Sequence, residues 1–199
     1  IYEDGLWKQA SGVNAEQATA ARLVALGEEE FVVDFGALGL WRRATTWSQL
    51  SGVNADYVAC GGAGFGGAQP IYGDFAATGL WQYLSGVWTA LSGVDADFMV
   101  TAYYDGDGAV ELFVDFGSTG VWLWDDPAWT QLSGVNVEFL IAADLNTDGE
   151  VEVIGDFGSL GIWLYGGASW TQLSGVNPEN MLAGDFDGDN QAEILADFE

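Results

Sequence analysis

The stretch FLIAADLNTDGEVEVIGDFGSLGIWLYGGASWTQLSGV, residues 139–176, decides the fold because it contains four short strand patterns in succession. Its apolar runs lie at 139–143, 151–157, 162–165 and 170–173, and the segments DLNTDG, GSLG and GGAS separate them. Short β-branched and aromatic runs with Gly, Asn and Asp between them are typical of strands joined by tight hairpins. We therefore expect these residues to form one antiparallel sheet of four strands.

The same pattern occurs five times along the chain. The tripeptide SGV and the pair Asp-Phe each recur at intervals of 40, 41, 41 and 41 residues. The SGV serines are Ser11, Ser51, Ser92, Ser133 and Ser174, and the Asp-Phe aspartates are Asp34, Asp74, Asp115, Asp156 and Asp197. Residues 15–26 look helical when taken alone, but they hold the register of a first strand, and we expect a strand there. A four-stranded repeat of this length has the size of a propeller blade.

The repeats predict an all-β fold, with residues 1–199 forming a single closed five-bladed β-propeller of ~41-residue, four-stranded repeats. In the register of the repeat, the chain begins within a third strand and stops just after a second strand. We expect both termini to contribute strands to one composite blade, since such closure removes free sheet edges. The alternative is a segment of a longer array, or pairing between chains in a polymer.

The composition narrows the classes of function. Thirty acidic residues face four basic ones, so the chain should repel nucleic acid and anionic membranes, and we expect no membrane insertion. The same charge attracts hard cations, although adaptation to salt or solubility explains it equally well. Histidine is absent from the sequence, which removes the commonest acid–base catalyst, and we expect no enzyme. Cys60 lies among small apolar residues and glycines and is expected to be a buried hydrophobic residue.

Two loops in the fourth and fifth copies carry oxygen side chains at positions 0, +2, +4 and +8. These are Asp144, Asn146, Asp148 and Glu152 in one loop, and Asp185, Asp187, Asp189 and Glu193 in the other. Alternating oxygen ligands around a tight turn can converge on one hard cation, and the main-chain carbonyls of Glu150 and Gln191 add a further oxygen to each set. The other interpretation is a polar hairpin turn with no ligand.

The loop spacing resembles the calcium loop of FG-GAP/VCBS repeats, which in that family lies between the first two strands of a propeller blade. The resemblance implies Ca²⁺ at the fourth and fifth loops, although Glu152 and Glu193 stand where that family usually has aspartate. The third copy keeps Asp105, Asp107 and Glu111 but has Tyr103 in place of the first aspartate, which predicts a weaker site. The corresponding residues of the first two copies exclude a site there; they are Arg22, Val24 and Leu26, and Gly62, Gly64 and Gly66.

Tryptophans recur at fixed positions in the repeat, and two interpretations of them stay open. Large rings fill the wedges between blades, but outer-strand tryptophans can also be stacking platforms for sugar rings. The candidates for stacking are Trp47, Trp88, Trp129 and Trp170. We therefore expect a secreted or cell-surface, calcium-binding and non-catalytic module for binding or adhesion, lectin-like, with glycans or extracellular matrix components as partners. The alternative is a self-assembling structural subunit of an extracellular filament, a surface layer or a larger adhesin.

Overall fold

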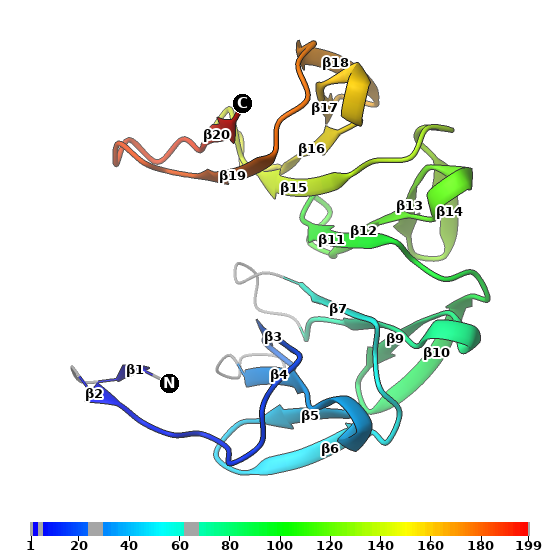
Figure 1. Ribbon diagram of the computed structural model, residues 1–199, viewed down its shortest axis with the longest axis vertical. Coiled ribbons are helices and arrows are strands. Elements are labelled where there is room, and N and C mark those ends of the chain that lie inside the picture. Colours follow the sequence, from blue (N-terminus) through cyan, green and yellow to red (C-terminus); the bar gives the residue numbers. More distant parts are fainter. Residues whose placement is uncertain (1, 4–5, 24–29, 62–67, 199) are drawn as a thin grey trace.

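The computed structural model describes residues 2–3, 6–23, 30–61 and 68–198. In this part of the chain the protein is all-β, with four four-stranded antiparallel sheets arranged along an arc and a two-stranded hairpin at each end (Figure 1). The strands are β3 (Gln17–Ala21), β4 (Glu30–Asp34), β5 (Leu40–Arg43) and β6 (Trp47–Ser51); β7 (Tyr57–Cys60), β8 (Ile71–Asp74), β9 (Leu80–Leu84) and β10 (Val87–Ser92); β11 (Phe98–Ala102), β12 (Glu111–Asp115), β13 (Val121–Asp125) and β14 (Ala128–Gln131); and β15 (Phe139–Ala143), β16 (Glu152–Asp156), β17 (Ile162–Gly166) and β18 (Ser169–Ser174). The terminal hairpins are β1 (Tyr2–Glu3) with β2 (Leu6–Trp7), and β19 (Asn180–Gly184) with β20 (Glu193–Asp197).

The repeat register predicted from the sequence is confirmed by these strands. In every copy the Asp-Phe aspartate is the last residue of the second strand, and in the first four copies a 3-10 turn comes directly after it. These turns are η1 (Gly36–Leu38), η2 (Ala76–Thr78), η3 (Gly117–Thr119) and η4 (Gly158–Leu160). Residues 17–21, which look helical in isolation, form strand β3, because pairing with β4 satisfies their backbone groups.

Glycine is required where each turn leads into the third strand. Gly39 has a φ of +74°, and a Cβ there would collide with the carbonyl oxygen of Ser51 on the neighbouring strand. Gly79, Gly120 and Gly161 stand in the same position with the same conformation. Both constraints exclude a side chain, so the repeated glycine is a consequence of backbone geometry.

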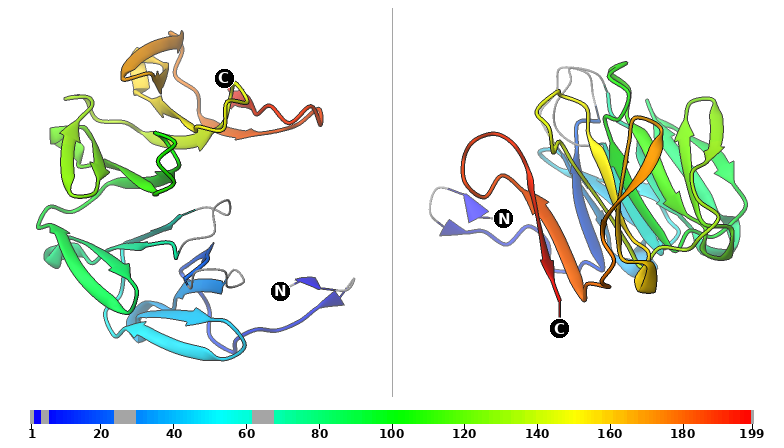
Figure 2. Two further views of the ribbon diagram at one scale, coloured as in Figure 1. Left: turned by 180° about the vertical axis from the view of Figure 1, so that it is seen from behind. Right: turned by 90° about the horizontal axis from the view of Figure 1, so that it is seen from above.

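The core lies between the sheets, where the second strands of the second, third and fourth copies are buried along their whole length. Leu112, Phe113 and Val114 of β12 are completely buried, and Phe113 packs with Leu140 and Val153 of the next copy. Full burial of one such side chain contributes about 1.5–3 kcal/mol to the free energy of unfolding. The first strands of successive copies contact one another, from β3 to β7, β11, β15 and β19, along the inner side of the arc (Figures 1 and 2).

Hydrogen bonds to the Asp-Phe aspartates fix the turns and connect neighbouring sheets. Asp34 Oδ1 accepts from the N–H of Gly36 at 3.1 Å, and Asp156 Oδ1 accepts from the N–H of Gly158 at 2.9 Å, so the aspartate caps the 3-10 turn. Asp74 Oδ2 accepts from the N–H of Ala96, which begins the next copy, at 3.0 Å. This aspartate therefore joins two successive sheets.

The two terminal hairpins lie apart at the ends of the arc (Figures 1 and 2). Within the described residues no strand pairing joins β20 to β1, and each hairpin is a separate two-stranded sheet. Leu195 of β20 is 59% exposed, whereas its counterpart Ile154 in the fourth copy is completely buried. Trp7 of β2 is 81% exposed. The structure thus has four complete sheets and two half-sheets with exposed apolar residues.

Cys60 is buried, as expected, and burial raises the pKa of its thiol to about 12, so it is not a reactive thiolate at neutral pH.

Candidate metal centres

The fifth-copy loop between β19 and β20 brings four acidic side chains together. One carboxylate oxygen from each of Asp185, Asp187, Asp189 and Glu193 lies within 4.8 Å of the others. Backbone hydrogen bonds position these groups: Asp185 Oδ1 accepts from Gly188 at 2.6 Å, and Asp189 Oδ1 accepts from Gln191 at 2.8 Å. Carboxylates held this close repel one another, and a hard cation with oxygen ligands is the charge that would relieve the repulsion.

The fourth-copy loop between β15 and β16 has the same backbone pattern with an amide among its acids. Asp144 Oδ1 accepts from the N–H of Thr147 at 2.6 Å, and Asp148 Oδ1 accepts from Glu150 at 2.9 Å. Asn146 Nδ2 donates to Oε1 of Glu152 at 2.7 Å. The sequence-predicted side chains of this loop are therefore held by the same turn, with one amide hydrogen bond between two of them.

The third-copy loop between β11 and β12 forms a cluster with one acid fewer. Carboxylate oxygens of Asp105, Asp107 and Glu111 lie within 4.8 Å of one another. Glu111 is only 1% exposed; its Oε2 accepts from the N–H of Tyr104 at 2.7 Å, whereas its buried Oε1 has no hydrogen-bond partner in the part of the chain that the structure describes. Burial raises the pKa of Glu111 to about 7. The N–H of Tyr104 opposes this rise, and the charges of Asp105 and Asp107 add to it. A buried carboxylate oxygen without a donor fits a cation as its partner.

The final glutamate of the loop is held in the same way in three copies. Oε2 accepts the backbone N–H of the residue after the first ligand position, in Glu111 from Tyr104, in Glu152 from Leu145 and in Glu193 from Phe186, at 2.7–2.9 Å. This hydrogen bond leaves Oε1 for other partners. Glutamate at +8 therefore fits these loops, in which it caps the turn with one oxygen.

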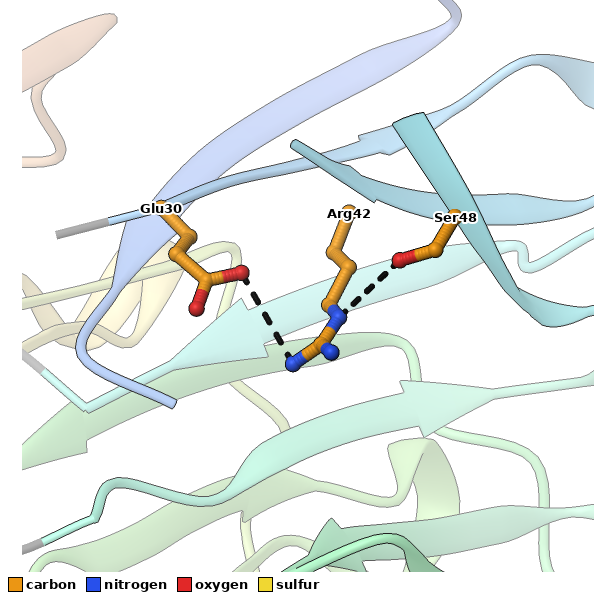
Figure 3. A network of polar contacts seen from close by, with 3 residues as sticks. All are labelled: Glu30, Arg42 and Ser48. Carbon is orange, nitrogen blue, oxygen red and sulfur yellow. Dashed lines mark hydrogen bonds and ion pairs between the residues drawn. The ribbon is translucent and has the colours of Figure 1, made fainter. Parts of the chain in front are cut away.

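In the first copy, an arginine faces the corresponding glutamate. Glu30 is 8% exposed, and its Oε2 lies 3.7 Å from Arg42 Nη1; Arg42 Nε also donates to Ser48 Oγ at 3.0 Å (Figure 3). The later copies have Gln82, Leu123 and Leu164 in place of this arginine. The guanidinium of Arg42 thus lies beside Glu30, whereas the equivalent glutamates of the third and fifth copies belong to acidic clusters. Sequence reasoning missed this pair, although three of the four basic residues lie in the first copy.

Arg22 hydrogen bonds through its main chain to Gln69 of the next copy, with Gln69 N donating to Arg22 O at 2.7 Å. The other residues whose types exclude a cation site in the first two copies lie outside the described part of the chain. They are Val24, Leu26, Gly62, Gly64 and Gly66.

Neighbouring loops are hydrogen bonded to one another. Val151 N donates to the carbonyl of Tyr103 at 2.9 Å, which joins the third and fourth loops. Ala192 N donates to the carbonyl of Asp144 at 3.0 Å, which joins the fourth and fifth loops. The third, fourth and fifth loops are therefore hydrogen bonded one to the next, and the position of each loop constrains that of its neighbour.

The four candidate stacking tryptophans lie half-buried between copies. Trp47, Trp88 and Trp170 donate their indole N–H to carbonyl oxygens of the preceding copy, Ala10, Leu50 and Leu132, at 3.0–3.1 Å. Each of the four also packs against the phenylalanine of an Asp-Phe pair, with ring centroids 5.0–5.5 Å apart. This geometry accounts for the repeated tryptophan as a link between sheets.

Two of these tryptophans also line equivalent apolar cavities. Trp129 with Trp122 and Val94 lines a cavity of about 300 Å³, and Trp170 with Trp163 lines one of about 170 Å³. Parts of both rings therefore face open space while their other parts pack in the core. The tryptophans of the third strand, Trp122 and Trp163, also line these cavities, although their place in the repeat did not mark them as candidates for stacking.

No protein-family model matches the chain, and no curated protein matches it. Among the described residues, no helix has the length and apolar character to cross a membrane.

Proposed function

We propose that the protein is a calcium-stabilised, five-bladed β-propeller of the FG-GAP/VCBS type that acts outside the cell as a non-catalytic binding or adhesion module. The observation that carries this proposal is the acidic cluster of the fifth loop, with four carboxylates within 4.8 Å, set between the first two strands of a repeated sheet. A second cluster in the third copy occupies the same place in its repeat.

Calcium is the cation that best suits these ligands. All of the side chains offer oxygen, and Ca²⁺ accepts six to eight oxygen ligands in flexible geometry. We assign the ions to the fourth and fifth loops, through Asp144, Asn146, Asp148, Glu152 and the carbonyl of Glu150, and through Asp185, Asp187, Asp189, Glu193 and the carbonyl of Gln191. Neutralising the clustered charges would stabilise the folded chain.

Closure of the ring is the second part of the proposal. The exposed apolar residues Trp7 and Leu195 belong to the two terminal hairpins, and their counterparts in complete sheets are half-buried or buried. Pairing of β20 with β1 would cover both and complete a fifth blade from the two ends of the chain. Burial of this surface, at about 25 cal/mol per Å², supplies the driving force.

The ligand-binding surface in this proposal is the set of tryptophan-lined cavities between blades. Flat aromatic faces stack on sugar rings, and equivalent cavities in successive copies permit multivalent binding of weak individual sites. Glycans of the extracellular matrix are the partner class that fits. Catalysis is not part of the proposal, because the loop acids and the tryptophans each recur in several copies and the sequence has no histidine.

Glycan-array binding of the full chain, with calcium and with EDTA, tests this function. We expect binding in calcium, weaker binding in EDTA, and loss of binding for Trp129→Ala with Trp170→Ala. The matched control is Trp124→Phe, which alters an indole outside both cavities. An array without a binding glycan under either condition would refute the lectin-like role.

A second function is supported by the exposed hairpins. The free edges of β1 and β20 are suited to pairing with another chain, and Leu6 of β2 (65% exposed) and Leu195 of β20 (59% exposed) lie in the same two hairpins. In that case the protein is a structural subunit of an extracellular filament or surface layer. Electron microscopy of concentrated native protein distinguishes the two functions, since filaments support the second and separate particles support the first.

A further inference from the structure

The two tryptophan-lined cavities have the same construction, with walls from two successive copies. One wall of the smaller cavity, of about 170 Å³, includes Val135 from the loop after β14. The other wall includes Leu160, Trp163 and Trp170 of the fourth copy. The larger cavity, of about 300 Å³, has Val94 in the place of Val135. Because Val135 is 45% exposed and Val94 is 52% exposed, both cavities open to solvent and a ligand can reach the aromatic rings.

The polar side chains around the smaller cavity are already paired within the protein. Among the described residues that line it, three have a side-chain donor: Ser133, Trp163 and Trp170. The indole N–H of Trp163 donates to the carbonyl of Leu160 at 2.9 Å, and that of Trp170 donates to a carbonyl of the preceding copy at 3.1 Å. Ser133 Oγ donates to the carbonyl of Val135 at 3.4 Å and accepts from its N–H at 3.0 Å. These walls therefore offer a ligand apolar contacts without a free side-chain donor.

Walls of this kind select the part of a sugar that enters the cavity. A hydroxyl group placed there would lose its hydrogen bonds to water and gain none, which is costly. A methyl group has no hydrogen bonds to lose, and its burial is favourable. An apolar cavity of about 150 Å³ holds a group of the size of benzene, so the smaller cavity takes a methyl group with adjoining ring carbons and leaves the rest of the sugar outside.

We propose that the two cavities recognise sugars by a methyl group, either the C6 methyl of a 6-deoxyhexose or the methyl of an N-acetyl group. The methyl group enters between the valine and the two tryptophans, and the hydroxyls of the sugar stay in water. This inference rests on the glycan-binding function proposed above and names the class of sugar that the same cavities would recognise.

The last residue of the 3-10 turn sets the size of the group that each cavity accepts. This residue is Leu160 in the smaller cavity and Thr119 in the larger one. Thr119 Oγ1 donates to the carbonyl of Phe116 at 3.2 Å, which leaves its lone pairs to accept the N–H of an acetamido group. We therefore assign the 6-deoxy methyl group to the smaller cavity and the bulkier N-acetyl group to the larger one.

Titration of the full chain with L-fucose and with L-galactose tests the proposal, because these sugars differ only at C6, where L-galactose has a hydroxyl. Tryptophan fluorescence measures the affinities, and saturation-transfer NMR identifies the sugar protons that contact the protein. We expect L-fucose to bind roughly 10–100-fold more tightly than L-galactose, with the strongest transfer to its methyl protons. N-acetylglucosamine and glucose are the corresponding pair for the N-acetyl group.

Exchanging the turn residues tests the assignment of each sugar to its cavity. The turn accepts either residue type, since Thr78 and Thr119 hold this position in other copies and Leu38 holds it in the first. We expect Leu160→Thr to weaken L-fucose binding by roughly tenfold and to favour N-acetylglucosamine, and Thr119→Leu to have the opposite effect. The matched control is Leu173→Thr, which alters an exposed leucine outside both cavities and should change neither affinity.

The possible failures separate this inference from the proposed function. Equal affinities for L-fucose and L-galactose, or transfer that does not favour the methyl protons, would overturn the inference while glycan binding itself stands. The same shift in the cavity variants and in the control would overturn the role of the turn residue. Binding of an apolar peptide without binding of any sugar would overturn both the inference and the lectin-like function, as would the absence of all binding.

Discussion

Replacing Asp95 by asparagine should stabilise the protein at alkaline pH. The other four copies carry asparagine at this position of the repeat: Asn14, Asn54, Asn136 and Asn177. With its amide nitrogen turned toward its acceptors, Asn54 donates to Asp34 Oδ2 and Gly36 O, both at 3.0 Å, and Asn177 donates to Asp156 Oδ1 at 2.9 Å. Asp95 has no such hydrogen to offer when ionised, and among the described residues no hydrogen-bond donor reaches Oδ1 of the fully buried Asp74 beside it.

The pKa of Asp74 gives the size and the sign of the effect. Burial raises this pKa to about 7; the N–H of Ala96 opposes the rise, and the charge of Asp95, a side-chain hydrogen bond between protonated Asp74 and Asp95, and the charge of Asp56 add to it. Because the unfolded chain has a value near 3.9, the folded state binds the proton more tightly. The stability that Asp74 contributes is therefore present below about pH 4 and is lost as the pH rises through about 7. A shift of about three units corresponds to about 4 kcal/mol as an order of magnitude.

An asparagine at position 95 would recover a hydrogen bond to the ionised Asp74, which contributes about 1.5–3 kcal/mol. At 2–4 °C for each kcal/mol in a chain of this size, the melting temperature at pH 8 should rise by about 3–12 °C. At pH 5, where Asp74 is protonated, the gain should be much smaller.

Urea unfolding of both proteins at pH 5, 6, 7 and 8, at fixed ionic strength and fixed calcium concentration, measures the effect. The matched control is Asn54→Asp, which places the same acid beside Asp34 and should lower stability as the pH rises. Equal stability of the Asp95→Asn variant and the native chain at pH 8, or an unchanged dependence on pH, would refute the reasoning.

Two further predictions concern ring closure and the first copy. Leu195→Ala should lower the free energy of unfolding by about 2–4 kcal/mol if the fifth blade closes over it. Leu112→Ala, at a fully buried site, is the control and should have a similar cost. A cost within about 0.5 kcal/mol for Leu195→Ala would agree with the 59% exposure of Leu195 in the open arc and contradict closure. Arg42→Leu should lower the free energy of unfolding by about 1–2 kcal/mol because it leaves Glu30 without its cationic neighbour. Adding Glu30→Leu to the same chain should recover much of that loss. Additive losses of the two variants in urea unfolding would show that the pair does not interact.

The part of the fold that could be predicted from sequence is the part set by local patterns. Period-two apolar runs, turn glycines and the spacing of Asp-Phe pairs fix the strands and their register, because each hairpin joins residues close in sequence. The loop acids come together for the same reason, since Asp185 and Glu193 are eight residues apart. The turn-capping role of Asp34 and Asp156 is likewise a contact over two residues.

Contacts between distant residues could not be predicted in this way. Asp74 meets Asp95 from another copy, and the ion pair of Glu30 with Arg42 depends on which side chains face each other across a sheet. The repeat indicates which positions are equivalent, but only the three-dimensional arrangement reveals where one copy has exchanged a donor for an acid.

Thermal unfolding of the full chain in calcium and in EDTA, at one constant ionic strength, tests the proposed stabilisation by calcium most directly. Constant ionic strength is essential because monovalent salt also stabilises so acidic a chain by screening. An ion that binds only the folded state adds about 2.7 kcal/mol at a hundredfold excess over its dissociation constant. We predict a lower melting temperature in EDTA, and loss of most of that sensitivity in Asp148→Ala with Asp189→Ala. Identical melting curves in calcium and EDTA, with no metal in the purified protein, would contradict the account.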